Sequence, residues 1–149
     1  TRAEADALCI DMAADLCAYA QPKGVTMILE PVNRYEIDYI NSVDQGVELL
    51  EKAGIPNLKL MPDVFHMNIE DARIGATLEK HIAQIAYIHL ADSNRHAPGD
   101  GHLDFMDVLG SLKKADYKGW CSVEILPLPD PDTAAARAIQ FLRGNFPIF

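Results

Sequence analysis

Four short apolar runs alternate with segments of helical periodicity along this chain of 149 residues. The runs cover 25–29, 58–61, 85–90 and 120–125. Short apolar runs of this kind are typical of strands buried on both faces, and helices between them favour parallel pairing. The pattern predicts an α/β fold with parallel strands, built from one helix followed by four βα units, and 1–149 is expected to form a single domain.

The helices are expected at 3–20, 42–54, 70–83, 105–114 and 133–142, with a break near Gly75 in the third. Ser42 and Gln45 match the spacing of a capping box, and Gly54 is a suitable helix end. Asp132 is expected to cap the last helix. No low-complexity segment or internal repeat divides the chain.

A metal-ligand type of side chain stands at the end of each predicted strand. Glu30 closes the first strand, Asp63 follows the second, and His89 and Glu124 fall late in the third and fourth. Successive positions lie roughly 30 residues apart, about one βα unit. Closure of such strands into a parallel barrel would bring the four side chains together at its C-terminal face, where active sites are built.

Each of these residues also has a simpler explanation. A lone carboxylate at a strand end most often caps the next helix or pairs with a cation, and His89, among apolar neighbours, is by itself best explained as a hydrogen-bonded core histidine. The four together favour a metal site. A donor set of three carboxylates and one imidazole suits Mn²⁺, Mg²⁺ or Co²⁺, with Zn²⁺ as an alternative.

Charge and composition exclude several other functions. The net charge is −9, with 13 Lys and Arg against 22 Asp and Glu, so nucleic acid and anionic membrane surfaces are not expected partners. No apolar run approaches the roughly 20 residues of a membrane span. The three cysteines form no C-x-x-C pair, and the first residues do not resemble a signal peptide, so a reduced, cytoplasmic protein is expected.

Four segments together resemble the signatures of a known family: LEPVNRYE at 29–36, DVFHMNIE at 63–70, HLADSNR at 89–95 and PGDGHLDF at 98–105. They are similar to the xylose-isomerase-like barrel superfamily, and within it to the D-tagatose/D-psicose 3-epimerase branch of ketose 3-epimerases. The resemblance implies a (β/α)₈ TIM barrel, of which this chain is the C-terminal half.

The resemblance also implies a ligand set and two catalytic roles. Glu30, Asp63, His89 and Glu124 would bind one divalent metal, with Mn²⁺ the first expectation. Glu30 and Glu124 would act as acid and base on opposite faces of C3 of a free ketose. The metal would stabilise the enediolate that forms when the proton at C3 leaves.

Three further positions match substrate-binding residues of the family. His66 and Arg95 would hold the ketose oxygens near the metal, and Glu36 would make a further sugar contact. Asn33 and Arg34 lie in the same loop, where they could contact substrate or fix Glu36.

Length is the main departure from the family pattern, since a complete barrel takes about 250 residues. Half a barrel would leave two strand edges and an apolar face exposed. A homo-oligomer, or pairing with a missing N-terminal half, is therefore expected. Pro62, where the family more often has an aliphatic residue, is expected to bend the strand end.

Two rival functions remain open at this point. An endonuclease-IV-like zinc phosphodiesterase is suggested by a wider set of candidate ligands, and the acidic charge opposes it; the set is Asp63, His66, His89, Asp100, His102 and Glu124. A non-catalytic barrel fragment with a vestigial site is the second. Among closer relatives, hydroxypyruvate isomerase and inosose dehydratase use similar sites, so the sequence does not select the sugar.

Overall fold

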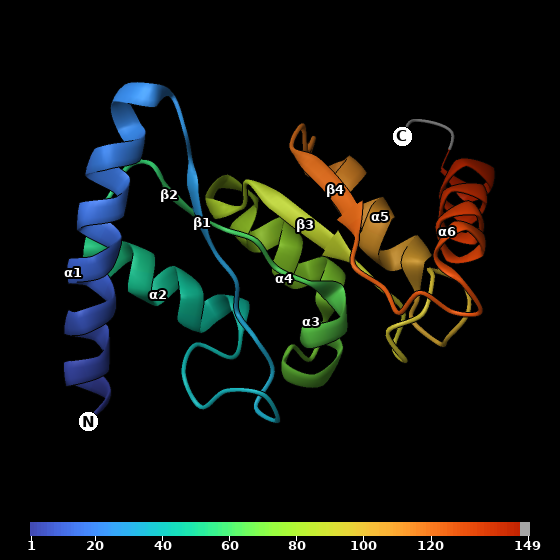
Figure 1. The fold of residues 1–149 in the computed structure, drawn as a ribbon, viewed down its shortest axis with the longest axis horizontal. Helices are drawn as coiled ribbons and strands as arrows, with labels where there is room; N and C mark the ends of the chain where they lie inside the picture. The colour runs from blue at the N-terminus through green and yellow to red at the C-terminus, as the bar shows by residue number, and fades with distance from the viewer. Residues whose placement is uncertain (147–149) are drawn as a thin grey trace.

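The computed structural model describes residues 1–146 and contains four strands, each followed by at least one helix (Figure 1). The strands are β1 (Met27–Leu29), β2 (Leu58–Leu60), β3 (Tyr87–Leu90) and β4 (Trp120–Val123). The helices are α1 (Arg2–Ala20), α2 (Val43–Ala53), α3 (Val64–Glu70), α4 (Ile74–His81), α5 (Phe105–Lys114) and α6 (Pro131–Asn145). Short 3₁₀ turns, η1 (Gln21–Lys23) and η2 (Ile82–Gln84), precede β1 and β3.

All strand pairs are parallel and follow chain order. β1 pairs with β2 and β3 with β4, while two isolated bridges, Leu60 to Ile85 and Asp63 to His89, connect β2 to β3. The order β1-β2-β3-β4 confirms the expected arrangement of parallel βα units. Within residues 1–146, the outer edges of β1 and β4 carry no further strand.

The helices pack in a row along one side of the strands. α1 contacts α2, α2 contacts α4, and α4 contacts α5, so the row follows the order of the strands (Figure 1). Gly75 allows α4 to approach α5 closely, because a Cβ at this position would overlap Ser111 of α5. No helix within residues 1–146 combines the length and apolar character that a membrane crossing requires.

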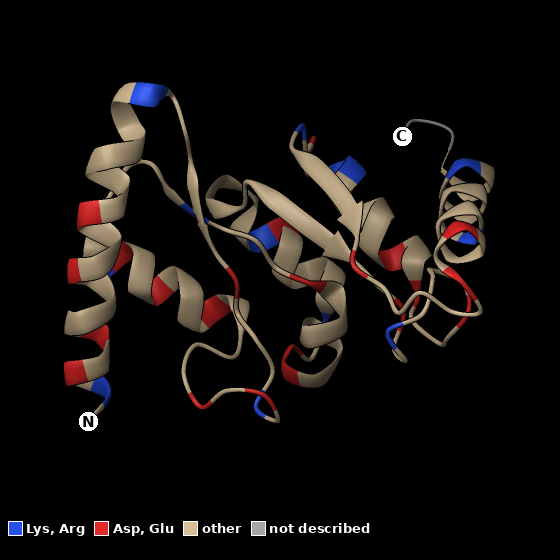
Figure 2. Cartoon of the chain, in the orientation of Figure 1, with Lys and Arg blue, Asp and Glu red and all other residues tan. Residues whose placement is uncertain are grey.

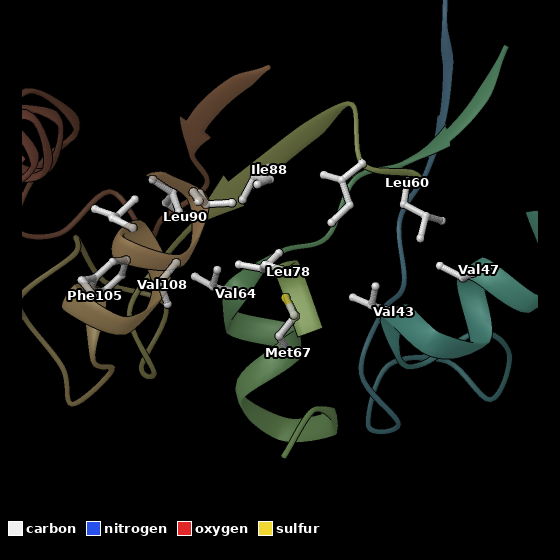
Figure 3. Close-up of a cluster of buried hydrophobic side chains, with 13 residues drawn as sticks. Val43, Val47, Leu60, Val64, Met67, Leu78, Ile88, Leu90, Phe105 and Val108 are labelled. Carbon is white, nitrogen blue, oxygen red and sulfur yellow. The ribbon is translucent and has the colours of Figure 1, made fainter. Parts of the chain in front are cut away.

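The hydrophobic core fills the space between the strands and this row of helices. Leu60 of β2 and Ile88 and Leu90 of β3 meet apolar side chains from α2, α3, α4 and α5 (Figure 3). Since side chains alternate along a strand, neighbours of these core residues face the opposite side of the sheet. That opposite face has no helical cover in the described chain.

Trp120 shows the consequence of this one-sided cover. A tryptophan is highly buried in most folded proteins, but Trp120 pairs with Tyr87 on the uncovered face and is 77% exposed. The apolar stripe of α1 is exposed in the same way, with Leu8 at 72%, Met12 at 59% and Leu16 at 46%. The helix itself was predicted correctly, but its buried face is formed by other residues, among them Cys17 and Ala20.

Two helix boundaries differ from the sequence expectation. The helix expected over 70–83 was expected to break near Gly75; the break lies at Asp71–Arg73, between α3 and α4, and Gly75 is inside α4. The last helix is capped by Asp130, not Asp132, because Pro131 occupies the first helical position and Asp130 accepts the Thr133 N–H at 2.9 Å.

Candidate metal and sugar site

The four strand-end residues lie on the uncovered face of the sheet. Ile28 of β1 and Ser122 of β4 point away from the core. Glu30 and Glu124 each lie two residues further along the chain, so strand alternation turns their side chains to the same face. His89 is itself a non-core position of β3, and Asp63 is bridged to it from the end of β2. The side chains therefore converge because they share one parity and one end of parallel strands.

The donor atoms of these four residues are close enough to share one ion. One oxygen or nitrogen from each of Glu30, Asp63, His89 and Glu124 lies within 4.8 Å of the others. His89 Nδ1 is 2.7 Å from Glu124 Oε2, 3.8 Å from Glu30 Oε1 and 4.0 Å from Asp63 Oδ2. The group contains three carboxylates and one imidazole, which is the set expected from the sequence.

Two of these atoms are buried without a hydrogen bond in the part of the chain that the structure describes. They are Glu30 Oε1 and His89 Nδ1. His89 Nδ1 approaches Glu124 closely but without the alignment of a hydrogen bond. Buried polar atoms are normally satisfied, and a cation would satisfy both of these at once. The donor set therefore fits a divalent metal.

Asp63 has two roles at the end of β2. Its Oδ1 accepts the Phe65 N–H at 2.9 Å and caps α3, while its Oδ2 faces the site and accepts from Arg95. The helix cap formed by Oδ1 is therefore compatible with a ligand role for Oδ2. The carbonyl of the preceding Pro62 accepts the His89 N–H at 3.0 Å, and the bend expected at Pro62 stays a prediction.

Arg95 places its positive charge among the carboxylates. It pairs with Asp63 and, at 2.8 Å, with Glu124, and its guanidinium lies 4.8 Å from the centre of the Phe65 ring. Its backbone is left-handed, with φ of 65°, and its carbonyl accepts the Leu126 N–H at 2.8 Å. The side chain expected to bind substrate is thus held at the site by a strained, hydrogen-bonded loop.

A single carboxylate, that of Asp92, organises the loop that carries Arg95. Asp92 is 1% exposed and accepts backbone N–H groups from Ser93, Gly99 and Leu103 at 2.7–3.0 Å. Burial alone would raise the pKa of Asp92, but these backbone donors together with that of Gly101 hold the pKa below its usual value. This role of Asp92 was not predicted from the sequence.

Replacing Asp92 with alanine is expected to lower the free energy of unfolding by about 3 kcal/mol, since several buried backbone donors lose a charged acceptor. Urea unfolding at pH 7 measures this change. Asp15→Ala removes an exposed acid from α1 and serves as the matched control. Equal stability of the two variants would show that the loop does not depend on Asp92.

His66 and Glu36 meet through Asn33 on the other side of the site. The Asn33 side-chain nitrogen lies 2.7 Å from His66 Nδ1 and 2.8 Å from Glu36 Oε1. His66 Nε2 is 3.9 Å from Glu30 Oε1, so the ring borders the four strand-end residues, which are called the ligand group below. Arg34 turns away and forms a bidentate pair with Glu70. Of the two open options for Asn33, the structure shows contact with Glu36, and it adds the unexpected bond to His66.

Asp100 and His102, from the wider ligand set of a nuclease-like site, contact other residues. His102 Nδ1 is 2.8 Å from Ser93 Oγ, and Asp100 pairs with Arg137 at 3.5 Å. Over residues 1–146, the only group of three or more side chains that could hold a metal ion is the one at the strand ends. Acidic residues outnumber basic ones along the chain, and no segment forms a basic stripe (Figure 2). These features oppose a phosphodiesterase that holds several zinc ions.

The site drives the pKa values of its two glutamates apart. Burial, followed by the charges of Asp63 and Glu124, raises the pKa of Glu30 to about 6. Burial also acts to raise the pKa of Glu124, but the charges of Arg95 and His89 outweigh it and lower this pKa. A carboxyl group with a raised pKa, such as Glu30, is suited to hold a proton, and one with a lowered pKa, such as Glu124, is suited to accept one.

Without metal, the raised pKa of Glu30 should make stability depend on pH. The folded state keeps a proton up to about pH 6 that the unfolded state loses near 4.5, so stability falls as pH rises through this window. Glu30→Gln should therefore be more stable than wild type by about 2 kcal/mol at pH 7.5, and equally stable at pH 4.

Urea unfolding with a chelator present, between pH 4 and 7.5, tests this expectation. Asp71, whose pKa burial raises to about 6 as well, contributes to the same window in both proteins, so only the difference between them reports on Glu30. Parallel pH profiles for the two proteins would contradict the expectation.

Comparison with known proteins places these observations in a family. Residues 1–145 match the model of the xylose isomerase-like TIM barrel family. L-ribulose 3-epimerase of Mesorhizobium japonicum is 36% identical over 111 residues, which are 74% of this chain and 37% of that protein. L-ribulose 3-epimerase of a Methylomonas species is also 36% identical and is matched over 88% of this chain and 52% of its own length.

Solved structures give the same result. The 3-keto-D-glucoside 4-epimerase of E. coli superposes with a TM-score of 0.91 at 26% identity, covering 97% of this chain and 55% of that one. A Methylomonas D-allulose 3-epimerase in complex with D-allulose gives 0.88 at 27% identity, covering 95% and 55%. This chain spans about half the length of these proteins or less. The matches confirm the resemblance to ketose 3-epimerases and the half-barrel architecture.

Proposed function

Because the chain belongs to the xylose isomerase-like TIM barrel family, we propose that it carries the catalytic centre of a sugar epimerase that inverts C3 of a free ketose. One observation carries the proposal. Four strand-end donors converge on one point, and two of their atoms are buried without a hydrogen bond among residues 1–146. The names of relatives that are 30–36% identical, L-ribulose and D-psicose 3-epimerase, supply the reaction class.

The same four residues are proposed to hold one divalent ion, Mn²⁺ in the first instance. Their oxygen-rich set suits hard ions, and Mg²⁺, Co²⁺ and Zn²⁺ are the alternatives that metal analysis would distinguish. When bound, such an ion would act as a Lewis acid on the ketose oxygens and make the proton at C3 easier to remove.

Glu30 and Glu124 are proposed to move the proton. In one direction Glu124, which favours its charged form, takes the proton from C3, and Glu30, which favours its protonated form, delivers one to the other face. In the reverse direction the roles exchange. They come from β1 and β4, the two ends of the strand order, so a sugar placed between them would meet a carboxylate on either side.

His66, Arg95 and Glu36 are proposed to orient the sugar. His66 and Arg95 border the ligand group, at Glu30 and at Glu124 respectively, and both can donate to sugar oxygens. Glu36 lies further out, is about half exposed, and can accept from a sugar hydroxyl. Arg95 also offsets the repulsion among the carboxylates, because its charge contacts two of them.

Partner and compartment are also proposals. The exposed apolar stripe of α1 and the open edges of β1 and β4 support pairing with further βα units, from a second copy or from the remaining length of a barrel. Cys9, Cys17 and Cys121 are unpaired in the described chain, which supports a reducing compartment such as the cytoplasm.

The experiment that tests the function is incubation of the protein with D-fructose, D-psicose and D-tagatose, with and without added Mn²⁺ or Co²⁺, followed by chromatographic separation of the C3 epimers. The proposal expects epimer formation that depends on the ion. Cleavage of DNA at abasic sites under the same conditions, without epimerisation, would replace it with the phosphodiesterase.

A further inference from the structure

Both polar atoms of the Asn33 side chain have hydrogen-bond partners, and these partners determine the orientation of its amide. The side chain is 1% exposed. Its Oδ1 accepts the backbone N–H of Tyr35 at 2.9 Å, while its Nδ2 faces His66 Nδ1 at 2.7 Å and Glu36 Oε1 at 2.8 Å. A backbone N–H can only donate, and a carboxylate can only accept.

The opposite orientation of the amide would be doubly unfavourable. Rotation by 180° would place the NH₂ group against the Tyr35 N–H and the carbonyl oxygen against the Glu36 carboxylate. Both contacts would bring like groups within hydrogen-bond distance. The amide therefore presents its two N–H bonds to Glu36 and His66.

We propose that Asn33 is a positioning residue that fixes the tautomer of His66, so that Nδ1 accepts from Asn33 and the ring proton sits on Nε2, facing the ligand group. A neutral imidazole carries one proton, so an Nδ1 that accepts leaves Nε2 as the donor. Asn33 itself does not touch the reacting atoms. It acts through His66.

The surroundings of His66 Nε2 determine what its proton can donate to. The carboxylate oxygen beside His66 Nε2 is Glu30 Oε1, at 3.9 Å, which is beyond hydrogen-bond length. The Nε2–H is thus left to donate to an oxygen brought to the site. The assignment of this oxygen to a ketose rests on the proposed function. The assignment of the tautomer does not depend on the proposed function.

The tautomer can be measured without metal or sugar. Two-bond ¹H–¹⁵N correlation spectra of the labelled protein at about pH 8, with a chelator present, distinguish protonated from unprotonated ring nitrogens. His66→Gln identifies the His66 signals by their loss. Wild type is expected to show a protonated Nε2 and an unprotonated Nδ1.

Two variants separate Asn33 from its neighbour. Asn33→Asp keeps an oxygen for the Tyr35 N–H but turns an acceptor toward His66, so the protonated and unprotonated nitrogens should exchange. Glu36→Gln keeps an oxygen that can accept from Asn33, so the wild-type pattern should persist.

A proton on Nδ1 in wild type, or an unchanged ring in a folded Asn33→Asp protein, would overturn the proposal. Exchange of the protons in Glu36→Gln would do the same, by assigning control to Glu36. If Asn33→Asp does not fold, the wild-type and Glu36→Gln spectra still decide. Since neither ion nor sugar is present, a failed epimerase assay leaves this result unaffected.

Discussion

Glu30→Gln and Glu124→Gln are each expected to lower C3 epimerisation of a ketose by about 10²- to 10⁴-fold, the usual contribution of a positioned acid or base. Glutamine keeps the size of the side chain and one oxygen, but it can neither take nor deliver the proton. Inversion needs both faces of C3, so each variant alone should show the loss. The remaining glutamate can still remove and return a proton on its own face, so each variant should keep exchange of the C3 proton with solvent deuterium for only one of the two epimers.

Glu48→Gln, an exposed position of α2, is the matched control and should retain full activity. Metal content has to be measured in each variant, because Glu30 and Glu124 are also proposed ligands. Loss of turnover in a variant saturated with Mn²⁺ assigns the effect to proton transfer. Unchanged turnover in either variant would remove the two-glutamate mechanism.

The second large effect is stabilisation by metal. At a free Mn²⁺ concentration 100 times the Kd, the wild-type protein should gain about 2.7 kcal/mol, which for a chain of this size is roughly 5–10 °C in Tm. The physical reason is the repulsion among three carboxylates around His89, which one cation would turn into attraction. Thermal unfolding at increasing Mn²⁺, with calorimetric titration for the Kd, measures this gain.

Asp63→Asn should lose most of this stabilisation while keeping the cap of α3, since Asn Oδ1 can still accept the Phe65 N–H. His102→Gln removes an imidazole outside the ligand group and should respond to Mn²⁺ like wild type. Equal stabilisation of Asp63→Asn and wild type would place the ion elsewhere.

The sequence predicted the strand-end residues well because their geometry follows from two simple periods. Strand alternation decides which side of the sheet a residue faces, and the length of a βα unit brings successive strand ends to one edge. Glu30, Asp63, His89 and Glu124 satisfy both conditions, so their convergence required no knowledge of loops. Their role as ligands stays a prediction until an ion is bound and measured.

The parts that the sequence did not predict depend on contacts between distant or irregular segments. Asp92 could not be recognised as the centre of its loop, because its donors come from turns that no periodicity describes. The bond from Asn33 to His66 joins two βα units in the same way. The exposure of Trp120 could not be predicted either, because apolar character indicates burial but does not say which partner provides it.

The sheet has the fewest hydrogen bonds between strands at its middle, between β2 and β3. β2 and β3 are joined only by two isolated bridges within residues 1–146, and Pro62 has no N–H to add another. Two of the proposed ligands lie on each side of this junction, with β1 and β2 on one side and β3 and β4 on the other. An ion at this point would link the two strand pairs, so the residues proposed to perform the chemistry would also strengthen the weakest junction of the sheet.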